Sequence, residues 1–228
     1  MNHNTSTGRI MGAAMLAGAL FEAWSNFALQ GRIFAGGGFL ANAAGQPETI
    51  GLIIVIGLVA SLLSLWAASL LMVSQAGAFP VHSRIYFALT AIALGATLVE
   101  LSTFVAMRGV SEMFVAAGPD SGSRFEIAKV IVGGLRNGLH FSTKTFEGVN
   151  LLAFYLLLFR ARAVPRLLAA AGIPAALLHM VGVGGPLFGR EVNLTLLAPI
   201  GLVYLATAAW LLVKGLPRSA DSGAQAGA

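Results

Sequence analysis

The residues best suited to chemistry form a polar stripe in an otherwise apolar segment between residues 125 and 159. Its members are spaced 7, 4, 3, 1, 3 and 3 residues apart, so on a helix they fall within an arc of roughly 120°. They are Lys129, Arg136, His140, Thr143, Lys144, Glu147 and Asn150. Charges are costly in contact with lipid, so the pattern predicts a helix whose polar side faces the interior of a membrane bundle.

Three further ionisable residues interrupt apolar segments elsewhere in the chain: Glu22, Glu100 and His179. Counted at 1.5 Å per residue from the predicted cytoplasmic ends, these three residues, Lys144 and Glu147 all lie about 18 to 22 Å deep. Five ionisable groups from four helices are therefore expected to meet at one level, in the outward half of the membrane. Ionisable residues at such depth commonly mark a functional site.

Arg136 and His140 are predicted to lie above this level, at the outer mouth. We therefore expect a hydrated, outward-facing cavity that binds a small polar or anionic ligand, or relays protons, with Lys144, Arg136 and His140 on its cationic side. The predicted ligand-binding residues are Glu22, Glu100, Arg136, His140, Lys144, Glu147 and His179.

A purely structural ion-pair network is the simpler alternative. Lys144 has Glu147 three residues away on the same helix face, and either cation of the outer mouth is a candidate partner for Glu100 or Glu22. Pairs of this kind hold helices together without any ligand.

Enzyme chemistry is another alternative. A metal-dependent intramembrane hydrolase acting on a lipid would use Glu22, Glu100, His140 and His179 as ligands. The nearby cations of the stripe repel a metal ion, and a bis-histidine haem is disfavoured because the two histidines differ in depth by about 8 Å. We therefore predict no bound metal or other cofactor. A further alternative is an accessory or regulatory subunit of a membrane complex.

The composition sets the class of protein. Of the 228 residues, 57% are apolar and only 10% are charged, and the mean hydropathy is +0.83, which excludes a water-soluble globule. The chain has no cysteine, which excludes disulfides and thiolate metal sites. The net charge of +5 is dispersed along the chain, so it predicts membrane orientation and no nucleic-acid partner.

Apolar stretches long enough to cross a bilayer core of about 30 Å predict an all-α membrane bundle with six transmembrane helices in one domain, residues 1–218. The spans are 10–29, 50–73, 85–107, 140–159 extended back to 125, 166–184 and 193–213. Lys and Arg flank the ends and even-numbered loops seven times against five, so both termini are predicted to be cytoplasmic. Residues 219–228 are predicted to form a disordered tail, and no cleaved signal segment is expected.

Several local features carry further expectations. The glycine-rich first loop is too apolar for a free linker and is expected to fold back onto the outer face. Pro119 to Ser121 predict a turn, and Pro174 and Pro199 predict kinks in the last two spans. The helix from 125 to 159 would be about 52 Å long, so it must leave the hydrocarbon or break near residues 133–134.

Four segments and one residue are familiar as a set: TGRIMGAAMLAGALFE at the start, the AAGPDSGS turn, His140, FYLLLFRARAVPRLLAAAGIPAALL with Pro165 and Arg166, and AAWLLVKGL at the end. They resemble a family of bacterial six-span membrane proteins catalogued as a domain of unknown function. The resemblance implies the fold and a multi-pass location in the bacterial inner membrane. We expect the lipid bilayer and a small-molecule ligand as partners, and keep open a homo-oligomer or a larger membrane complex.

Overall fold

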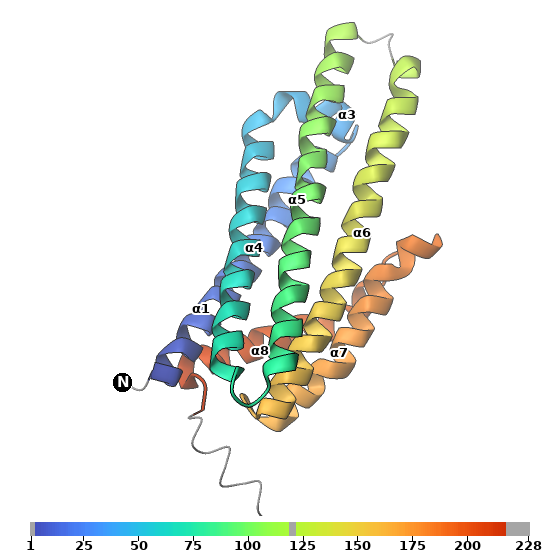
Figure 1. The fold of residues 1–228 in the computed structure, drawn as a ribbon. Coiled ribbons are helices and arrows are strands. Elements are labelled where there is room, and N and C mark those ends of the chain that lie inside the picture. The colour runs from blue at the N-terminus through green and yellow to red at the C-terminus, as the bar shows by residue number, and fades with distance from the viewer. Residues whose placement is uncertain (1–2, 119–121, 218–228) are drawn as a thin grey trace, which may run out of the picture.

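The computed structural model describes residues 3–118 and 122–217, and all regular structure in these ranges is helical (Figure 1). The long helices are α1 (His3–Ala23), α4 (Pro47–Gln75), α5 (Pro80–Ala117), α6 (Gly122–Ala161), α7 (Arg166–Gly184) and α8 (Ala198–Lys214). The prediction of an all-α fold is confirmed, and each predicted span overlaps one of these helices. The bounds differ most at α5, which ends at Ala117, ten residues after the predicted end at 107. The predicted turn at Pro119 to Ser121 and the tail 219–228 lie outside the described residues.

The six long helices form a closed ring. Each packs on the next in chain order, and α8 packs back on α1. A glycine makes this closure possible, because a Cβ at Gly12 would lie 2.4 Å from the backbone nitrogen of Leu212. The guanidinium of Arg9 also donates a hydrogen bond to the carbonyl of Val213 (3.2 Å). The first part of α1 is thus held against the last part of α8.

Within the described residues, four helices are long and apolar enough to cross a membrane. They are Pro47–Gln75, Pro80–Ala117, Arg166–Phe188 and Leu194–Lys214. Large apolar side chains that are more than half exposed occur on all six long helices, for example Leu20, Val55, Ile92, Val130, Val181 and Leu202. An apolar outer surface of this kind fits lipid rather than water, and the helices indicate a multi-pass membrane protein in a lipid bilayer.

The segment after α1 folds back onto α5, as the composition of the first loop predicts. It contains a π-helical segment (Trp24–Leu29), α2 (Gln30–Phe34), α3 (Phe39–Asn42) and a 3-10 turn (Ala43–Gly45). The hydroxyl of Ser111 on α5 donates to the carbonyl of Leu40 and accepts from the amide of Ala44, both at 2.8 Å. Phe39 and Leu40 are buried against this end of α5, so the segment is a packed cap and not a linker.

Two predictions about helix breaks have different outcomes. Helix α6 is continuous over its 40 residues, about 60 Å at 1.5 Å per residue, with no break near residues 133–134. Figure 1 shows its start, with the end of α5, extending beyond the other helices. The predicted kink at Pro199 is wrong: this proline lies in the first turn of α8, where no hydrogen bond is lost. Pro174 does lie inside α7. The 3-10 turns Gly185–Phe188 and Leu194–Leu196 connect α7 to α8.

Candidate functional site

A histidine–carboxylate pair joins α6 to α5 in the interior of the ring. Nδ1 of His140 lies 2.7 Å from Oε1 of Glu100, and the Glu100 side chain is only 8% exposed. The pair was one of the ion-pair partnerships expected from the sequence, and the structure confirms it.

One helical turn further along α6, a lysine contacts two carboxylates. Nζ of Lys144 lies 3.0 and 2.9 Å from the two carboxylate oxygens of Glu147, and 3.5 Å from Oε2 of Glu22 on α1. The ammonium group of Lys144 has three hydrogens, and these contacts can use all of them. The predicted contact between Lys144 and Glu147 is therefore confirmed, and α1 is drawn into the same cluster.

Arg136 forms no ion pair with a carboxylate in the part of the chain that the structure describes. Its guanidinium donates a hydrogen bond to the side-chain oxygen of Gln30, at the start of α2. It also lies over the rings of Phe34 and Phe104, 4.9 and 5.5 Å from their centroids. The Gln30 amide in turn donates to Asn26 Oδ1 at 2.7 Å. Arg136 thus anchors the cap segment through an amide and aromatic rings, and not through the carboxylates expected from the sequence.

His179 attaches α7 to the same turn of α6. Its Nε2 lies 3.2 Å from the backbone carbonyl of Lys144. A carbonyl oxygen only accepts, so Nε2 carries the hydrogen and donates it. This hydrogen bond fixes the ring beside the cluster.

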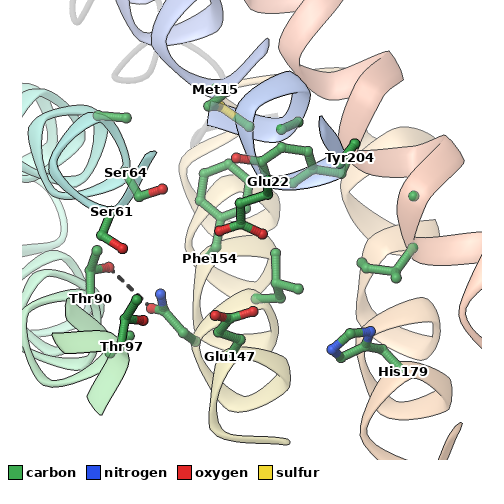
Figure 2. A pocket seen from close by; sticks show the side chains of 18 of the residues that line it. Met15, Glu22, Ser61, Ser64, Thr90, Thr97, Glu147, Phe154, His179 and Tyr204 are labelled. Carbon is green, nitrogen blue, oxygen red and sulfur yellow. Dashed lines mark hydrogen bonds between the residues drawn. The ribbon is translucent and has the colours of Figure 1, made fainter. Parts of the chain in front are cut away.

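A cavity of about 430 Å³ lies at the centre of the ring (Figure 2). All six long helices contribute to its lining. The polar and ionisable lining residues are Glu22, Asn26, Ser61, Ser64, Tyr86, Thr90, Thr97, Glu147, Asn150, His179 and Tyr204. In Figure 2 the carboxylate of Glu22 lies above that of Glu147, and His179 lies to the right of Glu147. The Thr90 hydroxyl is bonded to the side-chain oxygen of Asn150 (3.2 Å). Met15, Phe27 and Phe154 are among the apolar lining residues.

A second, much smaller pocket of about 40 Å³ adjoins the first. It is lined by Glu100 and Lys144, which do not line the large cavity. Five residues line both spaces: Glu22, Asn26, Ser61, Thr97 and Glu147. Lys144 therefore contacts the two carboxylates of the cluster from the side of the small pocket. The large cavity lies on the other side of these carboxylates.

The seven predicted site residues fall into three groups. Glu22, Glu147 and His179 line the large cavity, and Glu100 and Lys144 line only the small pocket. Arg136 and His140 line neither.

The ligand set of the metal alternative is not assembled. Among the described residues, no group of three or more His, Asp or Glu side chains could hold a metal ion. The reason is geometric, because His140 bonds Glu100 while His179 bonds a backbone carbonyl.

Sequence reasoning missed the contribution of α4. Ser61 and Ser64 line the cavity, and each hydroxyl donates to the carbonyl four residues earlier, at 2.9 and 3.1 Å. These bonds satisfy each hydroxyl within its own helix, so serines in an apolar span give little warning of a cavity. Their spacing of three residues was the available signal.

The ring of apolar helices with a polar centre defines the class: a polytopic all-α membrane protein. Residues 10–215 match the model of a family described as "Domain of unknown function (DUF4386)". The chain belongs to this family, which confirms the resemblance seen in the sequence. No match was found among curated proteins or among solved structures.

Proposed function

We propose that the protein spans the bacterial inner membrane six times, with both termini in the cytoplasm, and binds a small polar ligand in its central cavity. In this proposal α1 and α6 are the fifth and sixth spans beside the four helices of sufficient length and hydropathy. Both helices carry charged residues on the side that faces the interior of the ring, where Glu22 and Lys144 contact each other (3.5 Å). Their position in a closed ring with the other four supports a shared membrane location.

The observation that carries the proposal is the cavity itself. Ligand sites typically have volumes of about 300 to 1,000 Å³ and combine apolar walls with a few convergent polar groups. A space of about 430 Å³ lined by every long helix meets that description. A bundle whose polar groups served only to join helices would pack them against one another, as Arg136 packs on Phe34 and Phe104.

Proton relay is a second candidate function, supported by the order of groups along α6. His140 with Glu100, and Lys144 with Glu147 and Glu22, follow one another along α6, and the second group reaches the large cavity. Carboxylates and imidazole exchange protons readily near neutral pH. Proteoliposomes loaded with a pH dye would show a proton leak that Glu100→Gln and Glu147→Gln both abolish.

The test of the cavity uses the natural absence of cysteine. Ser64→Cys places a thiol in the cavity, and Ser69→Cys is a matched control on α4, since both serines are half-buried and each hydroxyl donates to the carbonyl four residues earlier. The purified variants in lipid nanodiscs would be exposed to neutral methyl methanethiosulfonate, and modification followed by mass spectrometry. The proposal expects residue 64 to react at least ten times faster than residue 69. Equal rates at the two positions would contradict it.

A further inference from the structure

Building on the proposed ligand-binding function, we infer that the cavity takes a monovalent organic cation, a small amine with an apolar body. The charges of the lining carry the inference. Among its residues are two carboxylates, Glu22 and Glu147, and no lysine or arginine. This differs from the sequence expectation, which placed Lys144, Arg136 and His140 around the ligand.

The position of Lys144 explains why its single positive charge does not neutralise both carboxylates of the cavity. Its ammonium contacts both carboxylates from the side of the small pocket, so one positive charge serves two carboxylates. Two carboxylates that share one ammonium group in a membrane favour a further positive charge beside them, a proton or a bound cation. The large cavity is where such a cation has room to reach the other side of Glu22 and Glu147.

The aromatic lining suits the same class of ligand. Tyr86, Phe154 and Tyr204 line the cavity together with the two carboxylates, and the rings of Tyr86 and Phe154 are 5.3 Å apart. Aromatic faces attract ammonium groups, most strongly where water is excluded. The remaining walls, including Met15 and Ile200, are apolar. Such walls fit the body of an amphiphilic amine, with its ammonium toward the carboxylates.

An anionic ligand would meet the opposite environment. Arg136 bonds Gln30 and packs on aromatic rings, and His140 bonds Glu100, so neither cation lines the large cavity. A carboxylate or phosphate there would face Glu22 and Glu147 without a cation of its own. The two carboxylates repel anions and attract cations, and both effects favour a cationic ligand.

The experiment measures protection of a cavity thiol by three probes of similar size. The Ser64→Cys variant in nanodiscs would be labelled with neutral methyl methanethiosulfonate in the presence of phenethylammonium, 2-phenylethanol or phenylacetate. We expect phenethylammonium to halve the labelling rate at a concentration at least ten times lower than either other probe. Adding Glu147→Gln should raise that concentration at least tenfold, and adding Glu48→Gln, an exposed carboxylate at the start of α4, should leave it unchanged.

Each of the other outcomes contradicts the inference. If 2-phenylethanol or phenylacetate protects as well as the amine, the cation class is wrong while the cavity still binds a ligand. If the thiol is labelled but no probe protects it, the inference fails and the cavity remains accessible. If residue 64 is not labelled above the Ser69→Cys control, both the proposed function and this inference are overturned.

Discussion

Nδ1 of His140 lies 2.7 Å from Oε1 of Glu100, so a hydrogen bond between these side chains joins α6 to α5 inside the ring. An ionised carboxylate only accepts, which requires Nδ1 to carry the hydrogen. The bond lies one turn of α6 from the Lys144 cluster, yet each set has its own partners. The two sets can therefore be disrupted separately.

Removing one partner of the His140–Glu100 pair should destabilise the fold. Glu100→Leu leaves a partly buried imidazole N–H without an acceptor, at a cost of about 1 to 3 kcal/mol in the free energy of unfolding. The double variant with His140→Leu should lose less than the sum of the single losses, because both partners are gone. Denaturation of the purified protein in micelles measures each value.

A matched control lies on the same helix. Glu112 forms an exposed ion pair with Arg108 (3.2 Å), so Glu112→Leu should change the unfolding free energy by less than about 1 kcal/mol. Additive losses for Glu100→Leu and His140→Leu would mean that the two side chains do not interact.

Lys144→Met should be the most damaging substitution in the cluster. It leaves the carboxylates of Glu147 and Glu22 without their cation, and breaking a buried pair costs about 3 to 5 kcal/mol in a dry site and less where water enters. Glu147→Gln in the same background should recover part of that loss, since it removes one of the two unmatched charges. A melting temperature that falls further in the double variant would count against this arrangement.

Closure of the ring can be tested with glycines. Gly12→Ala should lower stability, because the new Cβ would lie 2.4 Å from the backbone nitrogen of Leu212. Gly95→Ala on α5 meets no atom within 4 Å, so it should raise the free energy of unfolding by up to about 1 kcal/mol through helix propensity alone. Opposite signs for the two substitutions are expected in thermal unfolding. The same sign for both would mean that α1 and α8 do not approach closely.

The proposed topology predicts which loops face the outside of the cell. Single cysteines at Ala41, in the exposed part of the cap, and at Ala161, the last residue of α6, would be treated in intact cells with a maleimide that cannot cross membranes. Residue 41 should be labelled and residue 161 should not. The reverse pattern would place the termini outside.

Helix positions and local pairs were predictable from the sequence. Apolar runs give the spans because their length follows from the bilayer thickness. The contact between Lys144 and Glu147 follows from a spacing of three residues on one helix, which needs no knowledge of neighbouring helices. Counting residues along the helices also predicted that Glu22 and His179 lie at the level of Lys144, and both contact this residue.

Rotation and packing of the helices were not predictable. A polar stripe about 120° wide does not reveal which of its residues face a cavity and which face a neighbour, so Arg136 and His140 were expected at the ligand. Gln30, the partner of Arg136, directly follows the π-helical segment Trp24–Leu29, for which the sequence carries no clear signal. Pro199 was expected inside a helix because helix starts are uncertain by a few residues.

Occupation of the large cavity can be blocked without touching a charge. Gly201 lines the cavity, and a Cβ there would meet no atom within 4 Å, so the side chain of Gly201→Phe starts in open space and should fill part of the cavity. We expect this variant to fold and to slow labelling of a cysteine at residue 64 at least fivefold. Gly95→Phe, whose Cβ also meets open space but which does not line the cavity, is the control. Equal labelling in the two variants would mean that residue 201 does not face the cavity.

The most direct measurement is an experimental density map of the protein in nanodiscs, resolved well enough to show ordered water at the level of Glu22 and Glu147. A ligand-binding cavity predicts non-protein density within hydrogen-bond distance of these carboxylates, in a space bounded by all six long helices. Side chains from α1, α5 and α8 packed together across that space, with no room for water or ligand, would contradict it.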